Sequence, residues 1–158
     1  MEVSESGELV KRATHDVFSM MLGTELDAST PSQNRMPLSE SEVTALIGLA
    51  GFKQGSISVH CTREQARSFT ATLLGMDPAE VEGDSEIQDA LGEIVNMIAG
   101  NVKTGIADQG VVNISLPTVV MSDKRSVHVK APESVVVHFA SPFGEFAVEL
   151  VLQDGDTD

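Results

Sequence analysis

The sequence predicts an α+β domain in which a mostly antiparallel sheet of about six strands packs against two long helices and a shorter one. Two observations support this class. In three segments, apolar residues recur at steps of three and four, which places them on one face of a helix. In the second half of the chain they alternate with polar residues, as in half-buried antiparallel strands. With 158 residues the chain is long enough for one domain, expected over residues 1–152.

The first helix is expected over residues 7–22. Its apolar positions follow the helical period, and they are Leu9, Val10, Ala13, Val17, Met20 and Met21. Gly23 follows the last periodic position, and residues 28–37 are polar and contain proline. We therefore expect the helix to end near Gly23 and a loop to follow.

Residues 43–50 and 56–61 come next and are predicted to form a hairpin. Both runs are rich in β-branched residues, which favour strands. Between them lies a short connection that contains Gly51 and Gly55. Because glycine adopts positive φ without strain, such a connection suits a chain reversal.

The second helix is expected to begin after Thr62. Gln65, three residues later, completes a capping box with Thr62. The buried stripe of this helix is expected to be Ala66, Phe69, Thr70, Leu73 and Leu74. Gly75 marks its end.

The third helix is expected over residues 86–103, opened by a second capping box of Ser85 and Gln88. One side of this helix is apolar and is expected to face the sheet; it carries Ile87, Leu91, Ile94, Val95, Ile98 and Val102. The opposite side is small, polar and charged and is expected to face outward; it carries Asp89, Gly92, Glu93, Asn96, Gly100 and Lys103.

The remainder of the chain is predicted to be mostly strand. The alternating runs are residues 111–121, 126–130, 135–140 and 145–152. Pro117 has no N–H to donate, so its strand is expected at an edge of the sheet or bulged near this residue. Residues 153–158 are acidic and have nothing to bury, so a disordered tail is expected there. The sequence shows no clear internal repeat.

Composition excludes several functions. The formal net charge of −14 repels nucleic acid and anionic lipid surfaces, so neither is expected as a partner. A single cysteine, Cys61, excludes an internal disulfide, and no apolar run approaches the roughly 20 residues needed to span a bilayer. The sequence therefore favours a cytoplasmic protein without membrane association.

The outward side of the third helix offers the best candidate site. Glu93 and Asn96 are three residues apart, so a carboxylate and an amide lie side by side on that surface. Gly92 and Gly100 flank Asn96 at four residues on either side, although glycine is a poor helix former, and this indicates a close approach. The four-residue pattern is also common on ordinary solvated helices, so spacing alone does not establish a function.

Other chemistries find less support. His60 and Cys61 are neighbours on a strand and point to opposite faces, so they do not form a nucleophile and base, and a buried thiol is expected. The four histidines lie in different elements, so no metal site is predicted. The sequence also contains no phosphate-binding loop of the G-x-x-x-x-G-K-[ST] type.

Three stretches give the chain a resemblance to a known family. They are DALGEIVNMIAGNVKT (89–104), FSMMLGTEL (18–26) and ISLPTVV (114–120). Together they resemble the CheX branch of the CheC/CheX/FliY phosphatases of bacterial chemotaxis, over roughly residues 9–152. CheC carries two Glu-x-x-Asn pairs, whereas in this chain only Glu93 is followed by Asn at the third position. The resemblance is thus to the single-site CheX type, and it covers most of the predicted domain 1–152.

The resemblance implies removal of phosphate from an aspartyl phosphate on a CheY-like response-regulator receiver domain. In this family Asn96 would orient the attacking water and Glu93 would pair with a receiver lysine, while Asp89, Gly92, Gly100 and Lys103 would border the contact. It implies no cofactor in this chain, Mg²⁺ in the partner receiver, and a homodimer formed through the sheets. Two alternatives stay open: a non-catalytic module that binds a receiver or flagellar-switch component, and a purely structural domain.

Overall fold

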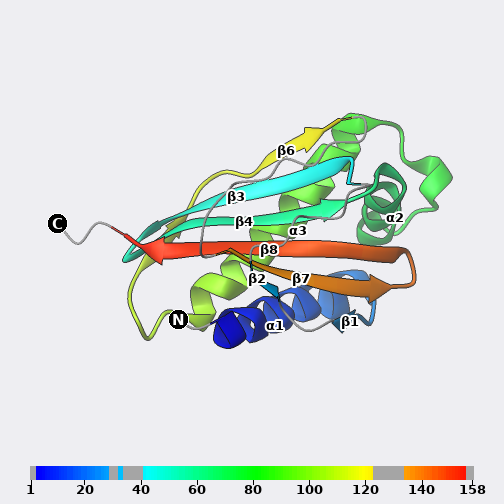
Figure 1. Cartoon of the computed structure of the whole chain (residues 1–158). Coiled ribbons are helices and arrows are strands. Elements are labelled where there is room, and N and C mark those ends of the chain that lie inside the picture. Colours follow the sequence, from blue (N-terminus) through cyan, green and yellow to red (C-terminus); the bar gives the residue numbers. More distant parts are fainter. Residues whose placement is uncertain (1–2, 29–31, 34–40, 123–133, 156–158) are drawn as a thin grey trace.

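The fold is an eight-stranded sheet with three helices packed on one of its faces (Figure 1). The computed structural model describes residues 3–28, 32–33, 41–122 and 134–155. The helices are α1 (Val3–Leu22), α2 (Arg63–Leu74) and α3 (Asp84–Gly105), with a short 3-10 turn, η1 (Pro78–Glu80), before α3. The α+β class and the mostly antiparallel sheet are confirmed.

Four long strands form the centre of the sheet: β3 (Val43–Gly51), β4 (Lys53–Cys61), β7 (Ser134–Ser141) and β8 (Gly144–Asp154). They lie in the order β7-β8-β4-β3, and every pairing is antiparallel. Four short strands extend this centre: β1 (Asp27–Ala28) and β2 (Ser32–Gln33) pair with β7, and β5 (Val112–Ile114) and β6 (Thr118–Met121) pair with β3. These short strands raise the count above the expected six.

Alternate residues of each central strand point toward the helices and form one core. On β8 these include Phe146, which stacks on Phe18 of α1 with ring centroids 5.0 Å apart and meets Phe69 of α2 edge-on at 5.2 Å. Helix α3 packs on β3 and joins α1 through Asn101, whose side chain donates to the carbonyl of Ala13 at 3.1 Å. The core therefore fixes α3 against both the sheet and a second helix.

The order of elements repeats along the chain. A long helix, two short strands and a hairpin (α1, β1, β2, β3, β4) are followed, after α2 and η1, by the same series (α3, β5, β6, β7, β8). The short strands of each series pair with the hairpin of the other. This repeat lies in the order and pairing of the elements, and it leaves too little common sequence to be seen as a repeat in the sequence.

Helix α1 ends at Leu22 as predicted but begins at Val3, four residues before the predicted start. The capping box of Thr62 and Gln65 is confirmed, and Gly75 ends α2 with φ +70°. The strand predicted over residues 111–121 is interrupted at Ser115–Pro117, which fits the break expected from Pro117 at an outer strand. The hairpin is confirmed, but with a tighter turn than expected, since β4 begins at Lys53.

Several local expectations are corrected. Helix α3 begins at Asp84 after Gly83, so Ser85 lies within the helix and does not cap it. Met20 and Met21 of α1 and Leu74 of α2 were expected to be buried but are at least half exposed. The strand β8 continues through Asp154, whose carboxylate contacts the Lys53 ammonium at 2.7 Å, so the acidic tail was predicted to begin too early. The strand expected over 126–130 and residues 156–158 lie outside the described residues.

Candidate functional site

Helix α3 presents the candidate site because its opposite side is firmly buried. The expected apolar stripe is confirmed: Ile87, Leu91, Ile94, Val95, Ile98 and Val102 all have at most 2% exposure. These contacts fix the rotation of the helix about its axis, so the positions between them are held at a defined angle to the sheet. Glu93 is exposed and Asn96 is half-buried on that remaining side.

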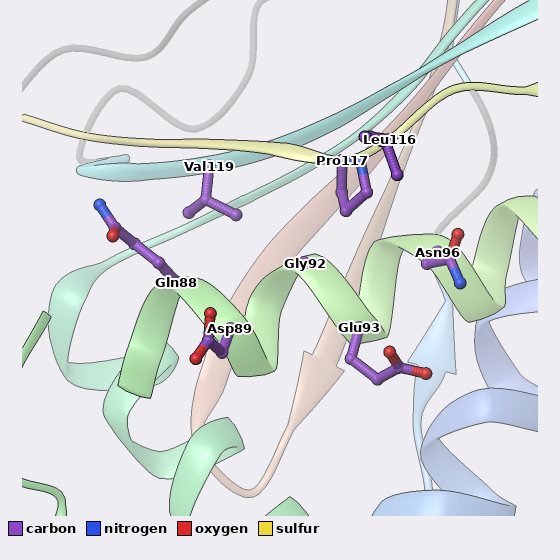
Figure 2. A pocket seen from close by; sticks show the side chains of 8 residues that line it. All are labelled: Gln88, Asp89, Gly92, Glu93, Asn96, Leu116, Pro117 and Val119. Atoms are coloured by element: carbon purple, nitrogen blue, oxygen red, sulfur yellow. The ribbon is translucent and has the colours of Figure 1, made fainter. Parts of the chain in front are cut away.

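An open groove of about 500 Å³ runs between α3 and the segment that connects β5 to β6 (Figure 2). One wall is the helix, with Gln88, Asp89, Gly92, Glu93 and Asn96, and the other wall consists of Leu116, Pro117 and Val119. Figure 2 shows the second wall alongside the helix at Gly92, with Asn96 on the next turn. The groove thus joins residues of two of the three segments quoted for the family resemblance.

Four of the six predicted site residues line this groove and two do not. Asp89, Gly92, Glu93 and Asn96 lie in it, whereas Gly100 and Lys103 lie one and two turns farther along the helix. Gly92 was expected to face outward, but it is buried beneath the second wall. A Cβ at Gly92 would lie 3.4 Å from Cγ of Pro117, so the close approach that its lack of a side chain permits comes from this chain itself. Gly100 has open space around it.

The side chains of Glu93 and Asn96 have no partner in the part of the chain that the structure describes. Within residues 3–28, 32–33, 41–122 and 134–155, neither side chain forms an ion pair or a hydrogen bond. The lining residues include two carboxylates, Asp89 and Glu93, and no cationic side chain. The groove is therefore negatively charged. Its carboxylates are free to bind a cationic side chain of a partner, and the amide of Asn96 is free to bind a small polar molecule such as water.

Other reactive groups lie elsewhere. Cys61 is fully buried, and burial together with the carboxylate of Glu42 raises the pKa of its thiol far above the ordinary value. The ring of His60 contacts Glu149 at 3.2 Å on the other face of the sheet, so the predicted separation of His60 from the thiol is confirmed. Among the described residues, no cluster of His, Cys, Asp and Glu is arranged to hold a metal, and no helix is long and apolar enough to cross a membrane.

Sequence reasoning missed the second wall of the groove. Leu116 and Pro117 were noticed as part of a motif and as a break in a strand, but no pattern in the sequence placed them against α3. Their position follows from the pairing of β5 and β6 with the same strand, β3, which brings the connection over Gly92.

Comparisons with known proteins agree with this arrangement. The family model described as "Chemotaxis phosphatase CheX" matches residues 43–140, more than half of the chain. The chain is 29% identical to the chemotaxis protein CheX of Desulfovibrio desulfuricans, with a TM-score of 0.83 over 94% of this chain and 99% of that one. It is 31% identical to a putative chemotaxis protein of Desulfovibrio vulgaris Hildenborough, with a TM-score of 0.82 over 94% and 97%.

A third structure contains a partner protein. The CheX of Borrelia burgdorferi, solved as a complex with CheY, BeF3 and Mg²⁺, is 25% identical, with a TM-score of 0.76 over 93% of this chain and 97% of that one. The search of curated protein sequences gave no significant match. On the family match and the agreement over nearly the full length of both Desulfovibrio structures, the chain belongs to the CheX family of chemotaxis phosphatases.

Proposed function

We propose that this chain removes the phosphoryl group from the aspartyl phosphate of a CheY-like receiver domain. The observation that carries the proposal is the pair Glu93 and Asn96, which projects from a well-packed helix into an open groove without partners in the described chain. The Borrelia relative was crystallised with CheY, BeF3 and Mg²⁺, which supports a receiver as the partner.

Asn96 is proposed to orient the attacking water. An acyl phosphate has a good leaving group, so its hydrolysis needs a water held in line with the phosphorus more than it needs acid or base catalysis. The amide oxygen accepts a hydrogen bond from this water and the NH2 group donates one nearby. The water oxygen then bonds to phosphorus, the bond between phosphorus and the aspartyl oxygen breaks, and the aspartate leaves as a carboxylate. The phosphate product keeps the protons of the water.

Glu93 is proposed to dock the receiver. Its negative charge disfavours direct contact with a phosphoryl group, whereas a lysine of the partner satisfies it with a charge-assisted hydrogen bond. Asp89 adds negative charge to the same groove and is proposed to border the contact, with Gly100 and Lys103 farther along the helix. In this proposal Mg²⁺ is held by the acidic site of the receiver, because the hard cation prefers carboxylate oxygens. Among the described residues of this chain, no cluster of His, Cys, Asp and Glu is arranged to hold a metal.

The quaternary structure is part of the proposal. The outer strands of the sheet are short on both sides, β1 and β2 beyond β7 and β5 and β6 beyond β3. Such edges have unpaired backbone groups that a second copy is able to cover. We propose a homodimer through the sheets, located in the cytoplasm, and sedimentation velocity at micromolar concentration tests the dimer.

Incubation with each phosphorylated receiver of the host, following the loss of aspartyl phosphate, tests the proposed activity. The expected result is faster loss with at least one receiver, together with capture of its phosphorylated form in a pull-down. Capture without faster loss supports a non-catalytic receiver-binding module instead. If no receiver is captured and none loses phosphate faster, the proposal is wrong.

A further inference from the structure

Leu116 is an apolar side chain displayed almost entirely to solvent at the edge of the groove. It is 88% exposed, the highest value among the large hydrophobic residues of the described chain. It lines the same groove as Glu93 and Asn96, from the opposite wall (Figure 2). Isolated exposed apolar residues are common on proteins, so exposure alone does not indicate a function.

The backbone around Leu116 is held in place, which distinguishes it from an ordinary loop residue. The N–H of Ser115 donates to the carbonyl of Gly48 at 3.0 Å, and the N–H of Gly48 donates to Oγ of Ser115 at 2.8 Å. The same hydroxyl donates to the carbonyl of Leu116 at 3.1 Å. Pro117, the next residue, lies against Gly92 of α3. Leu116 is therefore fixed on both sides, and binding through it loses little backbone entropy.

On the basis of the proposed function, we infer that Leu116 is an apolar anchor that positions the receiver domain on the groove. Its side chain inserts into an apolar depression of the receiver, beside the surface that presents the aspartyl phosphate. The anchor acts on affinity and orientation and takes no part in the reaction itself, so Leu116 is a positioning residue.

The receiver domain is the expected partner of Leu116 because this side chain belongs to the same surface as Asn96. Leu116 and Asn96 line one groove, so a partner that reaches Asn96 with its phosphoryl group also covers Leu116. The polar side of the groove is acidic and the whole chain has a formal charge of −14, so neither attracts the negatively charged phosphoryl group of a receiver. An apolar contact beside the groove supplies affinity that does not depend on charge, because it removes apolar surface from water.

Val111 offers a matched control. It is also apolar and is 72% exposed, in the segment between α3 and β5, but it does not line the groove. If exposed apolar residues bind the receiver nonspecifically, Leu116→Ser and Val111→Ser will have equal effects. If the anchor is specific, only the first will affect the receiver.

The experiment compares wild type, Leu116→Ser, Leu116→Met and Val111→Ser as full chains. Binding to a BeF3-activated receiver is titrated by calorimetry, and kcat and KM for the phosphorylated receiver are measured. We expect Leu116→Ser to weaken binding and raise KM by about tenfold, with kcat within about twofold, because a leucine loses its apolar contact on truncation. Leu116→Met and Val111→Ser are expected to stay within about threefold of wild type.

Each result bears on a defined claim. Wild-type binding and KM in Leu116→Ser, with an active wild type, overturn the anchor and leave the phosphatase proposal intact. An inactive wild type that binds no receiver overturns the phosphatase proposal. A changed sedimentation coefficient in Leu116→Ser, with unchanged receiver binding, assigns the leucine to a contact between copies and also overturns the anchor. Thermal melts followed by circular dichroism confirm that each variant is folded.

Discussion

Helices α1 and α3 lie on the same sheet and share a short pattern, yet they present different surfaces. In α1 Gly7, Leu9 and Val10 are buried and Glu8 is exposed, and in α3 Gly92, Ile94 and Val95 are buried and Glu93 is exposed. Each helix is followed by two short strands that pair with the hairpin of the other series. The fold therefore provides two similar positions for a carboxylate on a helix.

The side chain three residues later makes the difference. In α1 it is Lys11, whose ammonium lies 3.2 Å from the carboxylate of Glu8, and Arg12 and His15 line the same shallow depression. In α3 it is Asn96, which is neutral and leaves Glu93 unpaired among the described residues. A repeated scaffold thus supplies the position, while a single side chain decides whether the carboxylate is neutralised within the chain or left for a partner.

The largest effect is expected from removing the amide. Asn96→Ala should lower kcat by about 100-fold, because the water is no longer held in line, a loss similar to that of other groups that act only in the transition state. Lys11→Ala, the matched change on α1, should stay within about twofold of wild type, since it breaks only an exposed ion pair. Phosphate release at saturating receiver measures both. An equal fall in kcat in the two variants would contradict the proposal that α3, and not α1, carries the catalytic amide.

A smaller effect is expected from removing the carboxylate. Glu93→Ala should raise KM by about tenfold or more with kcat changed by less than about threefold, because a charge-assisted contact to the receiver is lost before the chemical step. Glu8→Ala is the control and should leave KM unchanged. A fall in kcat with constant KM in Glu93→Ala would place Glu93 in the reaction and not in docking.

The glycines of α3 provide a stability test of the comparison. Gly100 lies eight residues after Gly92 on α3. The residue eight positions after Gly7 on α1 is His15, so the two helices differ here. A Cβ at Gly100 meets no atom within 4 Å, so Gly100→Ala should raise the free energy of unfolding by about 0.5–1 kcal/mol. Gly92→Ala should gain less, because Pro117 lies 3.4 Å from the added carbon. Urea unfolding measures both, and equal gains would contradict the close packing of the second wall.

Copying the Glu93 and Asn96 pair onto α1 is not expected to restore phosphatase activity. In an Asn96→Ala background, Lys11→Asn places an amide three residues after Glu8. Arg12 still offsets one of the two carboxylates of that depression, Glu8 and Asp16, so the surface stays less acidic than the α3 groove. Activity should therefore stay at the level of Asn96→Ala alone. Recovery above about one tenth of wild-type kcat, well beyond what a residual contact gives, would show that the pair suffices without its surroundings.

The predictable parts of the molecule were those set by local sequence. The buried side of α3 follows from the spacing of Ile87, Leu91 and Ile94, and the start of α2 follows from Thr62 and Gln65. The start of α3 was missed because its acidic first turn is preceded by Gly83, which has no capping side chain, while Ser85 suggested a later start. The placement of Glu93 and Asn96 on one side of the helix was correct for the same local reason.

The unpredictable parts depend on contacts between distant segments. Nothing near Gly92 in the sequence reveals that Pro117 covers it, because that contact follows from the pairing of β5 and β6 with β3. The repeated order of elements was equally hidden, since the two helices share only a few residues beyond Gly7 and Glu8. The start of the acidic tail was predicted wrongly for a related reason. Gln153 and Asp154 are polar, but they pair with Gln54 and Lys53 of β4 and extend the sheet.

The most direct test of the central claim is a crystal structure of this chain with a receiver bound to BeF3 and Mg²⁺, in which BeF3 takes the place of the phosphoryl group. The account predicts the Asn96 amide at about 3 Å from a water in line with the bond between beryllium and the aspartyl oxygen, and Glu93 in contact with a receiver lysine. An amide turned away from the beryllium, or a Glu93 carboxylate bound by its own chain in the complex, would contradict it.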